Sequence, residues 1–265
     1  MKRTDGQQSV FTKTIVPMLF AWILALWAAT PQAAAAITVS AAASLGGVVS
    51  DVQKAFELKE PGIKVDFNLG SSGALRQQIE HGAPVDVFLS AAQEPVRALT
   101  ELGLVKEEEV WVFATNRLVL IQSRHTAFEM QSWEDLGRSE IRRIAIGNPD
   151  HVPAGQYGKS VLESLGLWET LQRKLVFAED VRQVLAYVEA GGADAGIVYR
   201  TDAADAKRAR LVADAPSGSH PPVVYLAAIV RASRQQGPAR AFVEFLLSGE
   251  GQAILHHHGF GGAGE

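Results

Sequence analysis

The 265-residue sequence contains no cysteine. Disulfide bonds are therefore excluded, and so is a lipid anchor on an N-terminal cysteine, so the fold must rely on its hydrophobic core. Basic residues are outnumbered by acidic ones: 25 Lys and Arg against 29 Asp and Glu give a net charge of −4. A net acidic chain is a poor candidate for binding nucleic acid or an anionic membrane surface. If the protein binds an anion, local donors must attract it, because the overall charge repels it.

Only one apolar run is long enough to concern a membrane, and it lies at residues 15–29. Three basic residues precede it, and Ala-x-Ala patterns at residues 33–36 follow it. This order is typical of a secretory signal peptide, and the run is short for a membrane-spanning helix, which needs about 20 apolar residues. We therefore expect residues 1–36 to be a cleaved signal peptide and the mature protein to begin near Ile37 in the periplasm. An uncleaved membrane anchor is the alternative.

Beyond residue 36, short apolar runs typical of strands alternate with amphipathic stretches typical of helices. Such alternation predicts an α/β fold with a largely parallel sheet. The order breaks at two consecutive strand-like runs, residues 110–114 and 118–122, and then resumes. The predicted strands are residues 37–42, 63–69, 85–89, 110–114, 118–122, 143–146, 175–177, 196–198, 211–212 and 223–230, and the predicted helices are residues 45–59, 75–81, 94–102, 156–165, 181–190, 239–247 and 251–257.

The break in the alternation indicates two α/β lobes. We expect residues 37–113 together with residues 218–265 to form the first lobe, and residues 114–217 to form the second. The chain would then cross between the lobes twice, which would allow the lobes to hinge.

Four segments each open a predicted helix directly after a predicted strand. A helix N-terminus carries unpaired backbone N–H groups and a partial positive charge, so it attracts anions without any Lys or Arg. Several such ends converging on one point would form an oxyanion cage of neutral donors. The segments are residues 41–45 (Ala-Ala-Ala-Ser-Leu), 70–73 (Gly-Ser-Ser-Gly), 151–155 (His-Val-Pro-Ala-Gly) and 178–182 (Ala-Glu-Asp-Val-Arg).

Each motif also has a plainer interpretation when it is taken alone. Ser44 and Asp180 occupy positions that ordinary N-cap residues take, and a proline at the start of a helix is common. Tyr199 ends a buried-looking strand, so it is also a candidate core aromatic. Signals for catalysis are weak, because the chain has no P-loop, no G-x-G-x-x-G after a strand, no H-E-x-x-H and no G-x-S-x-G. The consecutive residues His256–His258 point in different directions on a helix, so we expect no cation site there.

Taken together, five motifs in this order and spacing resemble the periplasmic molybdate-binding proteins of ABC transporters, and the resemblance covers essentially all of the mature chain. The motifs are residues 37–45 (Ile-Thr-Val…Ala-Ala-Ala-Ser-Leu), 76–88 (Arg-Gln-Gln-Ile-Glu…Gly-Ala-Pro-Val-Asp-Val-Phe), 147–155 (Gly-Asn-Pro-Asp-His-Val-Pro-Ala-Gly), 178–182 (Ala-Glu-Asp-Val-Arg) and 196–199 (Gly-Ile-Val-Tyr).

The resemblance implies a two-lobed type II periplasmic binding protein fold, with molybdate, and tungstate too, bound between the lobes. Carried over by motif, the ligand-binding groups are the hydroxyls of Ser44, Ser72 and Tyr199 and the backbone N–H groups of Ala154 and Val181. Ser71 adjoins Ser72, so the choice between these two serines stays open. Molybdate is a dianion whose oxygens only accept hydrogen bonds, so a cage made of donors suits it.

The resemblance also implies a solute-binding protein rather than an enzyme. We expect a monomer without a cofactor that delivers its ligand to a membrane permease and binds no nucleic acid. One alternative is a binder of another oxyanion, such as sulfate. A second is a periplasmic hydrolase that uses Ser44 or Tyr199 as a nucleophile, for which His151 is the nearest candidate base.

Overall fold

Two five-stranded β-sheets organise residues 35–263, the part of the chain that the computed structural model describes. The first has the strand order β2-β1-β3-β10-β4 and the second the order β7-β6-β8-β5-β9. The first sheet contains β1 (Ala35–Ala42), β2 (Ile63–Gly70), β3 (Val87–Ser90), β4 (Val105–Asn116) and β10 (Val223–Val230), and the second contains β5 (Leu118–Ser123), β6 (Ile144–Gly147), β7 (Leu175–Ala178), β8 (Ala195–Tyr199) and β9 (Ala209–Asp214).

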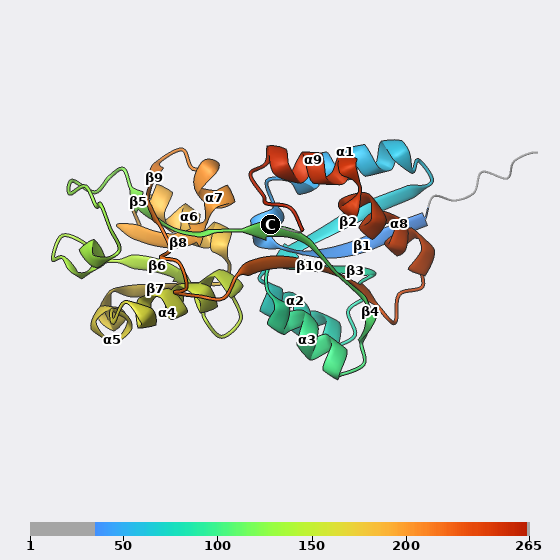
Figure 1. The fold of residues 1–265 in the computed structure, drawn as a ribbon, viewed down its shortest axis with the longest axis horizontal. Coiled ribbons are helices and arrows are strands. Elements are labelled where there is room, and N and C mark those ends of the chain that lie inside the picture. The colour runs from blue at the N-terminus through green and yellow to red at the C-terminus, as the bar shows by residue number, and fades with distance from the viewer. Residues whose placement is uncertain (1–34, 264–265) are drawn as a thin grey trace, which may run out of the picture. The chain divides into compact units, whose positions relative to one another are not determined.

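Helices cover both faces of each sheet (Figure 1). Against the first sheet, α1, α8 and α9 lie on one face and α2 and α3 on the other. Against the second sheet, α6 and α7 lie on one face and α4 and α5 on the other. The bounds are α1 (Val49–Lys59), α2 (Ser72–Glu80), α3 (Gln93–Glu101), α4 (Pro153–Ser164), α5 (Trp168–Leu171), α6 (Val181–Glu189), α7 (Arg200–Ala204), α8 (Gln236–Leu247) and α9 (Gly249–His257), with 3-10 turns η1 (Ala43–Leu45), η2 (Glu134–Gly137) and η3 (Gln172–Lys174).

Both sheets are mixed, whereas the sequence pattern predicts largely parallel ones. In the first sheet β1 is parallel to β2 and β3, but β10 is antiparallel to β3 and β4. In the second sheet β6 is parallel to β7 and β8, but β5 is antiparallel to β8 and β9. The strands β5 and β10 are the ones that the chain enters directly after crossing from the other sheet. They therefore start at the side where the parallel strands end, and must run the opposite way.

The structure changes the predicted start of several helices, and α8, expected from residue 239, begins at Gln236. The expected helix at residues 45–59 is divided into η1 and α1, because Gly46 and Gly47 form a turn between them. Helix α2 begins at Ser72, directly after its N-cap Ser71. Helix α4 begins at Pro153, since proline fits the first helical position, where its missing N–H has no partner to lose.

Sheet membership locates the two crossings of the chain at Arg117 and at residues 215–222. The predicted lobe boundaries at residues 113 and 217 stay predictions. Of the predicted signal peptide, residues 1–34 lie outside the described part, and Ala35 already belongs to β1. None of the helices described in residues 35–263 has the length and apolar character that crossing a membrane requires.

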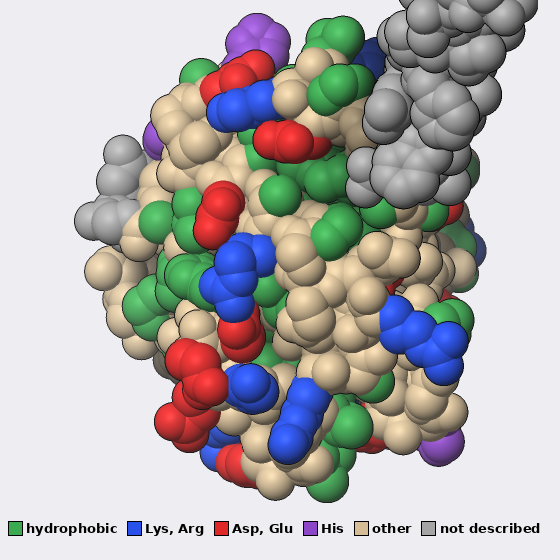
Figure 2. Space-filling view, turned by 90° about the vertical axis from the view of Figure 1, so that its right-hand side faces the viewer, with side chains coloured by type: hydrophobic (Ala, Val, Ile, Leu, Met, Phe, Trp, Pro, Cys, Tyr) green, Lys and Arg blue, Asp and Glu red, His purple; other side chains and the backbone are tan. Residues whose placement is uncertain are grey.

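Acidic and basic side chains are mixed on the protein face that Figure 2 shows. Surface ion pairs such as Arg97 with Glu101 and Lys59 with Glu250 join opposite charges. Screened pairs of this kind create little long-range field. A bound anion must therefore be held by groups in its immediate surroundings.

Candidate functional site

A small cavity lies where the carboxyl ends of strands from both sheets meet. Its volume is about 10 Å³. That is room for one compact group and excludes a nucleotide or a sugar in this conformation. The first sheet and its helices contribute Ala42, Ala43, Ser44, Gly70, Ser71, Ser72 and Ala91, and the second contributes Val152, Pro153, Ala154, Asp180, Val181 and Tyr199.

All five residues that the sequence singles out line this one cavity. Ser44 lies in η1, directly after β1, and is 4% exposed. Its Oγ lies 2.8 Å from the Oη of Tyr225, a fully buried residue of β10. The sequence did not indicate this contact, since the two residues are 181 positions apart.

The adjacent serines 71 and 72 have different hydrogen-bond roles. Ser71 is the N-cap of α2, and its side chain accepts a hydrogen bond from the N–H of Ala74 at 3.4 Å. Ser72 is fully buried, and its Oγ accepts from the N–H of Ala91 at 3.0 Å. Because a backbone N–H can only donate, the Ser72 hydroxyl keeps its own proton for another acceptor. Ser71 keeps its proton in the same way, and both serines line the cavity, so the choice between Ser71 and Ser72 stays open.

The backbone donors come from the first turns of two helices. Ala154 is the second residue of α4 and Val181 is the first residue of α6, so neither N–H has an acceptor within its own helix. Asp180 caps α6 by accepting from the N–H of Gln183 at 2.9 Å. Both N–H groups therefore remain available to a group in the cavity, and the partial positive charge of each helix end favours an anion there.

Tyr199 contributes a buried hydroxyl that lacks a partner. The residue is 1% exposed, and its Oη makes no hydrogen bond within residues 35–263. Burial raises the pKa of Tyr199 well above its ordinary value, so the hydroxyl is protonated at neutral pH and acts as a donor. A buried polar group left unsatisfied costs about 1–3 kcal/mol. An acceptor in the cavity would recover that free energy.

Asp180 is the one charged residue among those that line the cavity. The nearby arginines are held in ion pairs, as their positions on helix surfaces suggest: Arg76 with Glu80 and Glu94, Arg182 with Asp202 and Asp205, and Arg200 with Asp214. The site therefore depends on neutral donors rather than on a basic side chain.

Asp202 is a fully buried carboxyl at the start of α7, and the sequence pattern did not single it out. It accepts hydrogen bonds from the N–H of Tyr199 at 3.3 Å and from Arg182 at 3.3 Å. Burial raises the pKa of Asp202 to about 7, although Arg182 and the Tyr199 N–H act in the opposite direction. Its acidic neighbour Asp205 adds to the increase.

The described contacts give no support to a serine or tyrosine nucleophile. The Nε2 of His151 lies 3.4 Å from a carboxylate oxygen of Glu179, and the described hydrogen bonds join no histidine to Ser44, Ser72 or Tyr199. In the described part of the chain, no three His, Cys, Asp or Glu side chains are grouped to hold a metal ion.

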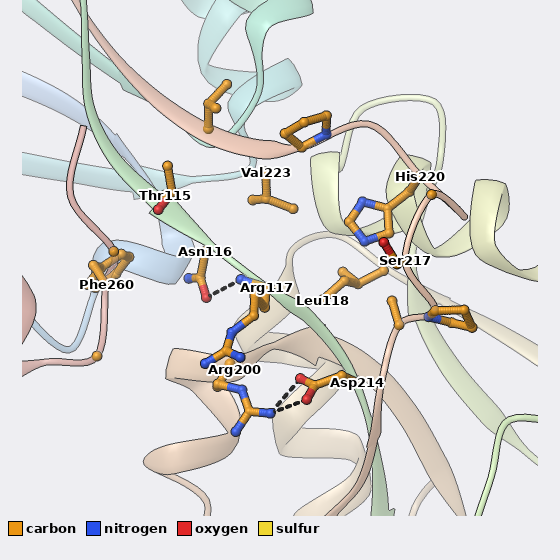
Figure 3. Close-up of a pocket in the computed structure, with 17 residues that line it drawn as sticks. Thr115, Asn116, Arg117, Leu118, Arg200, Asp214, Ser217, His220, Val223 and Phe260 are labelled. Atoms are coloured by element: carbon orange, nitrogen blue, oxygen red, sulfur yellow. Dashed lines mark hydrogen bonds and ion pairs between the residues drawn. The ribbon is translucent and has the colours of Figure 1, made fainter. Parts of the chain in front are cut away.

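A larger hollow, with a volume of about 650 Å³, lies beside the two chain crossings (Figure 3). Two of the charged residues that line this hollow neutralise each other, because the guanidinium of Arg200 contacts both carboxylate oxygens of Asp214 at 2.5 Å. None of the five predicted residues lines it. The smaller cavity combines unpaired donors from both sheets, so it is the candidate functional site in spite of its size.

Comparisons with known proteins agree with the fold. The family model of bacterial extracellular solute-binding proteins matches residues 37–261. Molybdate-binding proteins of Haemophilus influenzae and Escherichia coli are 36% and 37% identical to the chain. The alignments cover 86% and 84% of this chain and 91% and 88% of those proteins.

Solved structures show the same two-lobed architecture. The periplasmic molybdate-binding protein of Azotobacter vinelandii superimposes with a TM-score of 0.75 at 28% identity, over 84% of this chain and 98% of that one. A sulfate-binding protein of Mycobacterium tuberculosis, with a TM-score of 0.72 at 18% identity, shares the fold. The chain therefore has the two-lobed periplasmic binding protein fold and belongs to the family of bacterial extracellular solute-binding proteins.

Proposed function

We propose that this protein captures molybdate, and tungstate equally, outside the cytoplasm and delivers it to the membrane permease of an ABC transporter. The observation that carries the proposal is the buried Tyr199 hydroxyl, which has no partner within the described residues and lines a cavity rich in further donors. Relatives named as molybdate-binding proteins, at 36% and 37% identity, support the same ligand.

The proposed cage contains the hydroxyls of Ser44, Ser72 and Tyr199 and the N–H groups of Ala154 and Val181. Two of these residues come from the first sheet and its helices and three from the second, so the ligand would bind between the lobes. A dianion whose oxygens only accept hydrogen bonds can be satisfied by such a set without a buried countercharge. We propose further that the protein acts as a monomer, without a cofactor and without catalysis.

The N-terminal segment supports the proposed location. Residues 1–36 have the order of a secretory signal peptide, with basic residues, an apolar run and Ala-x-Ala patterns. Export and cleavage near Ile37 would place the mature protein in the periplasm. Mass spectrometry of the exported protein gives its first residue and tests this step directly.

Calorimetric titration of the mature protein with molybdate, tungstate, sulfate and phosphate tests the proposed ligand. Molybdate and tungstate have nearly the same size and charge, so we expect them to bind about equally tightly. Sulfate is smaller and would leave the hydrogen bonds stretched, so it should bind more weakly. Phosphate carries a proton near pH 7 that a cage of donors cannot accept, so it should bind most weakly. If sulfate bound more tightly than molybdate, sulfate would replace molybdate as the proposed ligand.

A further inference from the structure

We propose that Tyr225 and Asn116, which do not line the cavity, force the Ser44 hydroxyl to act only as a donor toward a bound anion. This inference rests on the proposed function and deepens it, because it assigns the rejection of protonated oxyanions to two positioning residues. The residues lie on β10 and at the end of β4, next to the point where the chain first crosses between the sheets.

A continuous set of hydrogen bonds joins these residues to the cavity. The Nδ2 of Asn116 lies 3.4 Å from the Oη of Tyr225 and 2.9 Å from the Oγ1 of Thr201. The Oη of Tyr225 in turn lies 2.8 Å from the Oγ of Ser44. Tyr225 is fully buried and Ser44 is 4% exposed, so water does not compete for the contact between these two hydroxyls, whereas Asn116 is half-buried and lines the larger hollow.

The backbone fixes the direction of this chain of bonds. The N–H of Arg117 donates to the Oδ1 of Asn116 at 2.8 Å, as Figure 3 shows, so the amide oxygen is identified and the NH₂ group must face Tyr225. An NH₂ group can only donate, so the Tyr225 hydroxyl accepts from Asn116, and the Ser44 Oγ is the one acceptor that the described contacts offer to the Tyr225 proton. Ser44 then accepts from Tyr225, and its remaining proton points to the cavity.

Ser72 has the same polarity by a shorter route, because its Oγ accepts from the N–H of Ala91. Both serines therefore present protons to the cavity, and a serine that turned to accept a proton from the ligand would lose the hydrogen bond that it donates. Asp180 is the one carboxylate in the lining, and its Oδ1 already accepts from the N–H of Gln183. A bound oxyanion that carries a proton would therefore lose a donated hydrogen bond wherever that proton faces Ser44 or Ser72.

A double-mutant cycle tests whether Tyr225 acts through Ser44. Calorimetry gives the molybdate affinity of the wild type, Tyr225→Phe, Ser44→Ala and the double variant. We expect Tyr225→Phe to weaken binding about tenfold, near the upper end of the range for a hydrogen bond between neutral groups. In the Ser44→Ala background the same change should cause no further loss. Independent, multiplying losses would overturn the inference, because a packing role of Tyr225 does not depend on the Ser44 hydroxyl.

Tyr157→Phe is the matched control, since Tyr157 is also buried but its hydroxyl is not part of the chain of bonds. It should leave the molybdate affinity unchanged. A loss as large as that of Tyr225→Phe would mean that removing any nearby phenol weakens the site, and would also overturn the inference.

Asn116→Asp tests the specificity directly, because it replaces the NH₂ donor by an acceptor and lets the chain of bonds reverse. The added charge weakens every anion, so the informative quantity is the ratio of phosphate to molybdate affinity, with phosphate measured by competition. We expect the variant to shift this ratio at least about fivefold toward phosphate. If the ratio of phosphate to molybdate affinity in Asn116→Asp is no higher than in the wild type, the inference is contradicted.

Failure of the proposed function has a separate signature: the wild type itself would not bind molybdate. The cycle would then be measured with whichever of tungstate, sulfate or phosphate the wild type does bind. If that ligand is phosphate, or if none of them binds, the inference fails together with the proposed function.

Discussion

Ser44 and Ser72 are buried, and each hydroxyl has a hydrogen bond to the protein and a proton left for a ligand. Replacing each serine separately tests the proposed cage. We predict that Ser44→Ala and Ser72→Ala each weaken molybdate binding by roughly 1.5–3 kcal/mol, the value of a hydrogen bond to a charged group. The free energy of unfolding should fall by only about 1 kcal/mol, as for an ordinary buried hydrogen bond. Calorimetry measures the first quantity and urea denaturation the second.

Two further serines make this comparison specific. Ser123 is equally buried but lies on β5, away from the cavity lining, so Ser123→Ala should leave the affinity unchanged. Ser71→Ala removes the cap of α2, so it should lower the free energy of unfolding by about 1 kcal/mol. It should affect the affinity less than Ser72→Ala does. If neither Ser44→Ala nor Ser72→Ala lowers the molybdate affinity, these serines have only capping and packing roles.

Asp202 should make the stability depend on pH near neutrality. Its pKa is about 7 in the folded protein, against an ordinary value of 3.8, so the folded state binds the proton more tightly than the unfolded state. The contribution of Asp202 to the free energy of unfolding is therefore greatest below about pH 4 and is lost as the pH rises through about 7. Between pH 5 and 8 we predict a loss on the order of 3 kcal/mol relative to Asp202→Asn. Urea denaturation across this range gives both curves, and parallel curves would contradict the prediction.

At the scale of single elements, the N-terminus of α6 combines a cap with the one charge that lines the cavity. Asparagine caps a helix about as well as aspartate, so Asp180→Asn should preserve the helix. It also removes a negative charge beside the proposed dianion, so we predict that molybdate binds roughly threefold to tenfold more tightly. Asp180→Ala removes the charge and the cap together, and should in addition lower the free energy of unfolding by about 1 kcal/mol. Unchanged affinity in the Asn variant would mean that the carboxylate points away from the ligand.

Elements with strong local signals could be predicted from the sequence. Helix α6 was expected at residues 181–190 and lies at Val181–Glu189, because an Asp cap precedes an amphipathic run and Gly191 follows it. Helix α7 was missed, since it has five mostly polar residues and its position depends on the ion pairs of Arg182 with Asp202 and Asp205. Its boundaries follow from tertiary contacts that no local pattern reveals.

The same division applies to the candidate site. The five proposed donors each lie in a motif, and the resemblance to a known family connects those motifs. Tyr225 and Asp202 could not be found in this way: Tyr225 reaches Ser44 across 181 residues, and the burial of Asp202 follows from how the helices around it pack. Residues that support a site through a neighbour carry no signal of their own in one sequence.

At the scale of the whole described unit, residues 35–263, one backbone contact joins the two lobes beside the cavity. The N–H of Gly73, at the start of α2, donates to the carbonyl oxygen of His151 at 3.0 Å. A Cβ atom at Gly73 would lie 2.5 Å from that oxygen and 2.7 Å from the Cα of His151. Because both neighbours are backbone atoms, they cannot rotate away. In this structure the two lobes meet at residue 73, and only glycine fits there. We call this arrangement the closed form.

Gly73→Ala should therefore affect the free and the bound protein in opposite directions. Alanine favours a helix over glycine by up to about 1 kcal/mol, so the unliganded protein, free to open, should keep or gain stability. In the closed form, the added Cβ atom would push residue 73 away from His151 and so disfavour closure. Because the ligand selects the closed form, we predict that molybdate binding weakens at least about tenfold. Gly237→Ala is the matched control, since Gly237 is also the second residue of a helix but a Cβ there would meet nothing within 4 Å. Small-angle scattering should show the radius of gyration falling on saturation with molybdate in the wild type and in Gly237→Ala, and falling less in Gly73→Ala. If Gly73→Ala binds molybdate as tightly as the wild type and closes as far, then the approach of Gly73 to His151 is not required for closure, and the cage assembles without it.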